Sequence, residues 1–498
     1  MVSGYLIDFP MLLAFRYGLM RAGGPLRRYL DAGPWGDALA YFLQIQYYRQ
    51  HSGAEPDTRC LFRGNSLHTP SWYHKFALTV WADTTLWSKP WLPNLVLYTF
   101  GIICLLVLSN AAIGGAVVAY VLLALIFLAQ VDNSLFDERT IHYLTIQPRL
   151  LGLVSLSVHA ALFAVMPSQT VAIAGGTLAL LLAINTSVFS RQVAYFVLPL
   201  AALLSWNIIP VLNLGLATAL SLTFNRAEFV ESFGAHWRYA VWYFKNFYRT
   251  REGGGLSHFV RRTFAPAVRY LPRYLDSVLA VALLGIVAGH ADDPFARRAM
   301  AMIGAALIVC AATALRKLAS LGECWRYISF ICWILTPIAL VHAVLALHIS
   351  LLLAYLVASA VLLCNVYRTF RLAGQLGNPN GEIAELLNSA FAGHVARPSV
   401  WWSSHFRYAS VAVALGFGAT TFEIQGTDLS EDLMVSLFAR YPYLRCDEEF
   451  FATHRVTHLL IAKHEWPVDL YGSIDKIISA CRVLAENSHF VILARPGA

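Results

Sequence analysis

Long apolar runs separated by short polar segments fill the first three quarters of the chain. A helix needs about 20 apolar residues to cross a bilayer. Tyr5–Met20 is a weak first candidate, because Asp8, Pro10 and Arg16 interrupt it, so the expected total is about ten or eleven spans. The ten clearer runs are Leu95–Ser109, Ala111–Gln130, Leu150–Met166, Val171–Phe189, Val193–Trp206, Ile208–Phe224, Leu275–Gly289, Met300–Leu315, Tyr327–Leu345 and Ala346–Val366.

Two polar stretches interrupt this pattern. Residues 21–93 form a first large loop rich in Trp, Tyr and His. Residues 225–273 hold nine Lys/Arg against three Glu, interleaved with aromatic residues. That mixture is typical of amphipathic helices in the lipid headgroup layer. An ordinary basic cytoplasmic loop would have the same composition, and the two interpretations are equally well supported.

The chain changes character after Val366, so we expect a transmembrane domain over 1–366 and a soluble domain over 367–498. Strands are predicted at Ala419–Ile424, Val456–Ala462 and His489–Leu493, and helices at Ser430–Arg440 and Ser473–Asn487. Strands that alternate with helices indicate a small α/β domain. The predicted fold is therefore an α-helical polytopic membrane protein with a C-terminal α/β domain.

Composition supports a membrane location. Hydrophobic residues make up 58% of the 498 positions and charged residues only 13%, against about 25% charged in soluble domains. The formal net charge of +8 fits contact with anionic lipid headgroups or with phosphate ligands. The sequence contains no nucleic-acid-binding motif, so we expect membrane lipids as partners and no nucleic acid.

A cluster of charge lies between two uncharged runs, Ala111–Gln130 and Leu150–Ser190. Ionisable groups at the end of a membrane span are costly and often functional. They could orient a polar substrate or coordinate a divalent cation through oxygen atoms, although the loop could equally neutralise itself. The sequence indicates no cofactor other than such a cation and does not establish that the cation is needed. The residues concerned are Asp137, Glu138, Arg139 and His142, with Arg149 after them.

Asp37 is the candidate general base. It follows the turn formed by Gly33, Pro34 and Gly36, and an amphipathic helix is predicted to follow it. A carboxylate there could accept a proton from an attacking hydroxyl. An aspartate before a helix is also a common N-cap, and from the residues alone the cap is the better-supported role.

Further candidates lie in the first loop and before the ninth clear span. Arg59, Arg63 and Lys75 could bind phosphate, and His74 could contact substrate. An interfacial loop with an aromatic belt would also contain such residues.

The turn Gly322-Glu323-Cys-Trp-Arg326-Tyr327 adds three candidates for substrate binding, namely its Glu, Arg and Tyr. Because Glu323 and Arg326 are three residues apart, they would share one face of a helix. An ion pair with a purely structural role is at least as well supported as a substrate contact.

The order of these motifs resembles that of the GT-C superfamily of polytopic glycosyltransferases. The matching elements are Gly36-Asp37 before an aromatic helix, Thr69-Pro70 with His74, Asp137-Glu138-Arg139, and Gly322 to Tyr327 before the last spans. The Gly-Glu-x-x-Arg-Tyr turn is similar to turns in bacterial membrane proteins of surface-polysaccharide pathways.

The resemblance implies transfer of a sugar from a polyprenyl-phosphate donor to a lipid, glycan or protein acceptor. The reaction would occur at the outer face of the bacterial inner membrane, with a periplasmic C-terminal domain. Asp37 would be the catalytic base.

Other functions and topologies also fit. The chain could be a transporter or flippase for a lipid-linked oligosaccharide, or a non-catalytic scaffold of a polysaccharide assembly complex. If Val193–Phe224 crosses the membrane twice, Asp37, the Asp137 loop, the 225–273 stretch and the Glu323 turn share one face. If it is one helix kinked at Pro210, the Glu323 turn lies on the opposite face from Asp37. We expect the first arrangement.

Overall fold

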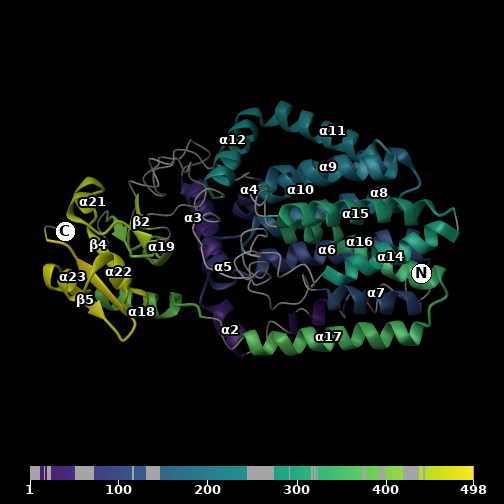
Figure 1. The fold of residues 1–498 in the computed structure, drawn as a ribbon. Coiled ribbons are helices and arrows are strands. Elements are labelled where there is room, and N and C mark those ends of the chain that lie inside the picture. The colour runs from purple at the N-terminus through teal and green to yellow at the C-terminus, as the bar shows by residue number, and fades with distance from the viewer. Residues whose placement is uncertain are drawn as a thin grey trace, which may run out of the picture. The chain divides into compact units, whose positions relative to one another are not determined.

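The computed structural model describes most of the chain (Figure 1). The described residues are 10, 12–15, 17–18, 24–50, 72–114, 117–130, 146–243, 274–290, 292–315, 318, 321, 324–373, 377–391, 399–405, 407–418, 437–440 and 443–496. They form two compact units. The first contains residues 1–27, 69–73 and 92–376, and the second contains residues 28–68, 74–91 and 377–498.

The first unit is a bundle of apolar helices, as the hydropathy pattern predicted. Among the described residues, seven helices are long and apolar enough to cross a membrane, and three shorter apolar helices accompany them. The seven are α6 (Leu92–Ile113), α8 (Pro148–Val165), α9 (Gln169–Thr186), α10 (Val188–Ser205), α15 (Pro294–Ala314), α16 (Cys324–Ala346) and α17 (Leu351–Ala373). The shorter ones are α7 (Val117–Ala129), α11 (Ile209–Phe224) and α14 (Leu275–His290).

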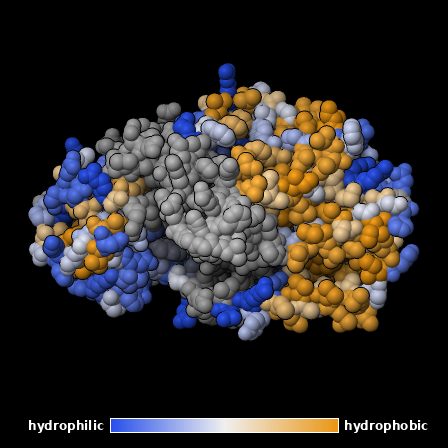
Figure 2. Space-filling view, in the orientation of Figure 1, coloured by the Kyte–Doolittle hydropathy of each residue, from blue (hydrophilic) through white to orange (hydrophobic). Residues whose placement is uncertain are grey.

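Burial separates central from peripheral helices. Along α16, 89% of the most apolar window is buried inside the protein, against 11% along α17. Because α17 exposes apolar side chains on most of its surface, it needs an apolar solvent, which a bilayer provides. Figure 2 shows the same apolar surface over much of the bundle. The protein is therefore a multi-pass membrane protein.

The segment Val193–Phe224 forms two helices and not one kinked helix. α10 ends at Ser205, and Trp206 adopts a left-handed conformation with φ of 49° that turns the chain. Pro210 lies in the first turn of α11, where a missing N–H costs nothing. The hydroxyls of Tyr195 and Thr218 are 2.7 Å apart, which pairs the middle of α10 with the middle of α11. The expected helical hairpin is confirmed.

This hairpin sets the direction of every later helix. α6, α8, α10, α14 and α16 begin at one end of the bundle, and α7, α9, α11, α15 and α17 end there (Figure 1). Contacts between helix beginnings define this end: the hydroxyls of Tyr274 and Ser329 are 2.9 Å apart, and the ring of Phe189 lies under the guanidinium of Arg149. We call it the Arg326 end. The helix α12 (Arg226–Tyr243) follows α11 there.

The second unit contains short helices from the N-terminal region and a C-terminal α/β domain. The N-terminal helices are α3 (Asp37–Gln50), α5 (Asp83–Ser88), half of α2 (Gly24–Asp31) and most of α4 (Trp72–Val80), and the C-terminal part adds α18 (Asn380–Ala390) and α19 (Arg407–Ala414). A four-stranded sheet has the order β1-β4-β6-β5. Its strands are β1 (Trp401–Trp402), β4 (His458–Ala462), β6 (Phe490–Ala494) and β5 (Arg482–Glu486). The remaining short elements are β2 (Phe438–Arg440), β3 (Tyr443–Leu444), α21 (Glu448–Thr453), the 3-10 turn η5 (Lys463–Glu465), α22 (Val468–Tyr471) and α23 (Asp475–Ala480).

The predicted strands at Val456–Ala462 and His489–Leu493 correspond to β4 and β6, which pair antiparallel and are buried. The predicted helix Ser473–Asn487 is wrong over its second half. α23 stops at Ala480, and Arg482–Glu486 forms the antiparallel edge strand β5 beside β6. The predicted helix Ser430–Arg440 is also wrong at its end, where Phe438–Arg440 pairs with β3. Pairing with a neighbouring strand overrides local helix propensity in both places.

Candidate functional site

A group of cationic and aromatic side chains occupies the Arg326 end of the first unit. The ring of Phe189, at the start of α10, lies at its centre. The guanidinium carbon of Arg326 is 3.4 Å from the centroid of this ring, and that of Arg149 is 4.6 Å away. The imidazole of His236 on α12 meets the same ring edge-on, with centroids 6.4 Å apart. We call Arg149, Phe189, Arg191, His236 and Arg326 the basic cluster.

The basic cluster concentrates positive charge where a bundle of apolar helices ends. The side chains of Arg149 and Arg326 are half-buried, and both guanidinium groups rest on one ring. A cation over an aromatic face gains about 0.5–2 kcal/mol, but two like charges on one ring repel each other. The planar guanidinium matches the geometry of phosphate oxygens, so the arrangement can hold a phosphate group.

Arg191 is held in place by hydrogen bonds within the protein. The residue is 1% exposed. Its Nε and Nη2 donate to the carbonyl of Ile184 at 3.1 and 2.9 Å, and Nη1 donates to the hydroxyl of Ser232 at 2.9 Å. Its guanidinium carbon also lies 4.4 Å from the ring centroid of Phe229. Arg191 therefore fastens α12 to the ends of α9 and α10.

A close approach of α8 and α10 brings Arg149 to Phe189. A Cβ at Gly152 would lie 1.9 Å from the Oγ of Ser190 and 2.9 Å from the Cβ of Ser187. Only glycine fits this position without a shift of the neighbouring residues. Because Arg149 lies one turn before Gly152 and Phe189 directly precedes Ser190, this contact positions two members of the basic cluster.

His236 is neutral in this environment. α12 is not among the membrane-spanning helices. Burial, followed by the positive charges of Arg191 and Arg326, lowers the pKa of His236 to about 4. Its Nε2 is shielded from solvent and has no hydrogen-bond partner among the described residues. A neutral imidazole can donate one hydrogen bond without adding to the positive charge of the cluster.

Asp37 belongs to the second unit, where it is the first residue of α3. Its side chain is outside the described part of the structure. The turn before it is held firmly. Gly33 and Gly36 have φ of 97° and 63°, which other residues rarely adopt. The side chain of Asn378 donates to the carbonyl of Gly33 at 2.9 Å, and that of Asn380 donates to the carbonyl of Pro34 at 2.7 Å.

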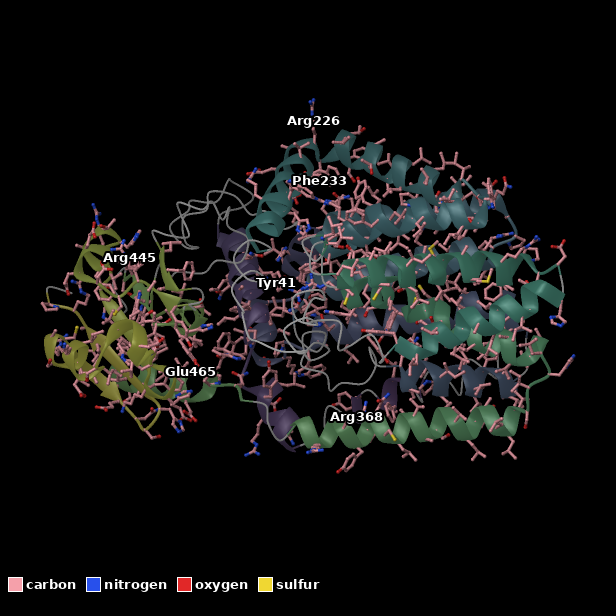
Figure 3. All side chains as sticks on the ribbon, in the orientation of Figure 1. Tyr41, Arg226, Phe233, Arg368, Arg445 and Glu465 are labelled. Carbon is pink, nitrogen blue, oxygen red and sulfur yellow. The ribbon has the colours of Figure 1, made fainter. Side chains whose placement is uncertain are left out.

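α3 is buried along its length by aromatic neighbours. The ring of Tyr41 packs against His74 with centroids 5.6 Å apart, and Phe42 packs against Trp87 at 5.4 Å. His74 is 1% exposed, so its ring is part of this packed core. Lys75 on the same helix, α4, is exposed. Figure 3 shows the position of Tyr41 on α3.

The structure describes some of the other candidate residues and not others. Arg326 joins the basic cluster, whereas Tyr327 is buried, with its hydroxyl donating to the carbonyl of Leu321. The remaining candidates lie outside the described residues: Arg59, Arg63, Asp137, Glu138, Arg139, His142 and Glu323. Among the described residues, no group of His, Cys, Asp or Glu could hold a metal ion, so the divalent cation stays a prediction that concerns the Asp137 loop.

Sequence reasoning did not single out Arg191 and His236 or group them with Arg326. A signal for Arg191 exists, since it is the charge that ends the uncharged run Leu150–Ser190. No signal connects it to His236, which is 45 positions further along the chain. Only the packing of α12 against α10 brings the two together.

No protein-family model and no curated protein matches this sequence. Solved structures do match the fold. ArnT from Cupriavidus metallidurans bound to undecaprenyl phosphate is 12% identical, with a TM-score of 0.61 over 100% of this chain and 99% of that one. ArnT from the same organism in the apo state is 13% identical, with a TM-score of 0.60 over 99% and 98% of the two chains.

A third match is more distant. The oligosaccharyltransferase of Archaeoglobus fulgidus, in complex with Zn and sulfate, is 10% identical, with a TM-score of 0.57 over 91% of this chain and 68% of that one. ArnT and the oligosaccharyltransferase share the fold of the GT-C glycosyltransferases. The chain described here has this fold, as its order of motifs predicted.

Proposed function

We propose that this protein is a membrane glycosyltransferase that transfers a sugar from a polyprenyl-phosphate donor to a lipid, glycan or protein acceptor. The observation that carries the proposal is the basic cluster, which two half-buried arginines form on one aromatic ring at the end of an apolar bundle. The fold supports it, because ArnT with the same fold has been solved with undecaprenyl phosphate bound.

The cluster suits a lipid-linked phosphate better than a free one. A polyprenyl chain needs an apolar surface, and its phosphate needs cations at the level of the headgroups. The helices offer the first, with Phe224 75% exposed at the end of α11. Arg149 and Arg326 offer the second at the same end of the bundle. Fixed cations also stabilise the charge that develops on a departing phosphate.

We propose Asp37 as the general base. In the reaction, the acceptor oxygen forms a bond to the anomeric carbon of the sugar, and the bond from that carbon to the phosphate oxygen breaks. The electron pair of the broken bond stays on the phosphate, and Asp37 takes the acceptor proton. The clasped turn before α3 supports this role, since a catalytic carboxylate must be held in place.

The remaining assignments extend the same proposal. Asp137, Glu138, Arg139 and His142 would position the acceptor or a divalent cation. Arg59, Arg63 and Lys75 would bind phosphate. The reaction would take place at the outer face of the bacterial inner membrane, with the C-terminal domain in the periplasm.

Purified protein with radiolabelled polyprenyl-phosphate sugars tests the proposal. We expect Asp37→Asn to abolish transfer while donor binding persists, and Arg326→Gln to weaken donor binding at least tenfold, which corresponds to about 1.4 kcal/mol. Arg297→Gln is the matched control, because Arg297 lies at the opposite end in an ion pair with Asp292 and its side chain is 56% exposed. Full transfer by Asp37→Asn would remove it from the mechanism. Equal donor binding by all three variants would refute the phosphate site.

A further inference from the structure

His236 is the member of the basic cluster whose charge can change. Arginine stays protonated at any physiological pH, so Arg149, Arg191 and Arg326 are fixed cations. The imidazole of His236 sits edge-on to Phe189, the same ring that carries both half-buried guanidinium groups. Its shielded Nε2 has no hydrogen-bond partner in the described part of the chain. The residue is thus placed to sense the charge of whatever binds there.

The phosphate changes its charge during the proposed reaction. In the donor, the phosphate is a diester with one negative charge at any pH above its low pKa. Once the sugar has left, the phosphate is a monoester with a second pKa near 6, and therefore close to two negative charges at pH 7. One site must hold both forms in turn, and fixed arginines cannot respond to the difference.

We propose that His236 is a phosphate ligand that follows this change, neutral beside the donor diester and protonated beside the product monoester. The inference rests on the proposed function and deepens it. In the donor complex, the neutral ring donates one hydrogen bond to a phosphate oxygen. When the bond to the sugar breaks, the phosphate gains an electron pair. Asp37 releases the acceptor proton to the solvent, and Nδ1 or Nε2 of His236 takes up one proton from the solvent. The imidazolium then balances the second charge of the leaving phosphate.

Charged groups from several elements surround this imidazole. Arg191 on α10 and Arg326 on α16 disfavour a proton on it, Arg149 on α8 lies over the same Phe189 ring, and Glu228 is about two turns before it on α12 itself. Tyr195 and Tyr327 add neutral hydroxyls. In the free protein, burial and the charges of Arg191 and Arg326 keep His236 neutral. A bound dianion adds two negative charges near the imidazole, so protonation of His236 becomes favourable.

Thermodynamic linkage fixes the sign of the effect. His236 binds its proton only below a pKa of about 4 in the free protein, and binding of a dianion raises that pKa. Between the two pKa values the complex holds one more proton than the free protein, so product affinity rises as pH falls. The limit is tenfold per pH unit for one proton. His236→Gln keeps a neutral hydrogen-bond donor and loses this dependence.

The experiment measures binding of two probes to the full-length protein in detergent, at pH 7.5 and pH 6.0. One probe is a polyprenyl phosphate, and the other is its methyl diester, whose charge is fixed. The monoester's own titration is common to wild type and His236→Gln, so the ratio of their affinities isolates the histidine. For the monoester, we expect this ratio to grow on the order of tenfold from pH 7.5 to pH 6.0. For the diester, we expect it to stay within about twofold.

A second measurement needs no variant. Calorimetry of wild-type protein with the monoester in two buffers of different ionisation heat counts the protons taken up on binding. We expect about one more proton than the probe's own titration supplies. A monoester ratio that does not change with pH would overturn the role of His236 and leave the glycosyltransferase proposal standing. Failure of wild type to bind either probe would overturn the proposed function itself.

Discussion

Arg191 provides the sharpest test of the basic cluster, because this buried residue holds α12 against α9 and α10. We predict that Arg191→Met releases α12 from the bundle. Methionine fills a similar volume without a charge. It loses the hydrogen bonds to the Ile184 carbonyl and the Ser232 hydroxyl, and the stacking on Phe229.

The magnitude follows from these contacts. The Ile184 carbonyl, near the C-terminal end of α9, would lose both donors, and an unsatisfied buried acceptor costs about 1–3 kcal/mol. The stacking on Phe229 contributes about 1 kcal/mol more. Relief from burying a guanidinium offsets part of the loss. We therefore expect α12 to be destabilised by roughly 2–3 kcal/mol, which is about a 30- to 150-fold rise in the population with α12 released.

Cysteine labelling measures this population. Ala235 is 4% exposed on α12, so Ala235→Cys reacts with a maleimide only when the helix lifts. The labelling rate, followed by peptide mass spectrometry, should rise about 30- to 150-fold in the Arg191→Met background. Arg297→Met, at the opposite end, is the control and should leave the rate unchanged. A rise below threefold in Arg191→Met would show that other contacts hold α12, and the reasoning about Arg191 would be wrong.

Three further predictions concern other parts of the chain. Gly152→Ala should reduce donor affinity and lower the folding stability by roughly 1–3 kcal/mol through overpacking, because its Cβ would lie 1.9 Å from Ser190 Oγ. The added substitution Ser190→Ala should restore part of the affinity and part of the thermal stability. If it restores neither, the steric argument is wrong. Asp447→Ala should lower thermal stability by about 1 kcal/mol through loss of the cap on α21, since its carboxylate accepts from the N–H of Phe450 at 2.8 Å. Burial opposes the charge of Asp447, but hydrogen bonds from Arg445 and Phe450 hold its pKa below the usual value of 3.8. The difference in stability between wild type and Asp447→Ala should therefore be full above pH 3.8 and shrink as the pH falls below it. A difference that is larger at pH 3 than at pH 7 would contradict the assignment. Gly418→Ala should destabilise the second unit by roughly 1–3 kcal/mol, because a Cβ there would lie 2.2 Å from the ring of Trp401, and unchanged thermal unfolding would refute this.

Hydropathy alone predicted much of the bundle, for a physical reason. A helix in a bilayer must satisfy its own backbone groups and present apolar side chains to lipid. Length and composition therefore suffice to locate α6, α8 and α16, whose observed bounds differ from those predicted by a few residues. The break at Trp206 was harder, because neither Asn207 nor Pro210 alone distinguishes a kink from a tight turn.

The C-terminal domain shows where local pattern fails. Ile474, Ile477 and Ile478 have helical spacing, yet the helix ends at Ala480 because Arg482–Glu486 gains a partner in β6. This pairing depends on the fold of the whole domain, so the sequence of residues 482–486 alone does not reveal it. The basic cluster was missed for the same reason. Arg326 was a candidate from its own turn, whereas Arg191 and His236 acquire their roles only when α10 and α12 pack together.

The clasp on the Asp37 turn has a consequence for biosynthesis. Asn378 and Asn380 lie 345 and 346 positions after the carbonyls that they hold, beyond the last membrane helix. The ribosome adds about 5–20 residues per second, so Asn378 and Asn380 are synthesised roughly 20–70 s after the turn that they hold. A nascent chain that stalls before residue 378 would leave the ten apolar helices of the described residues in the membrane, while the Asp37 turn lacked the hydrogen bonds from Asn378 and Asn380. We expect such truncated products to be inactive, because the residues that hold the Asp37 turn are synthesised after the membrane helices.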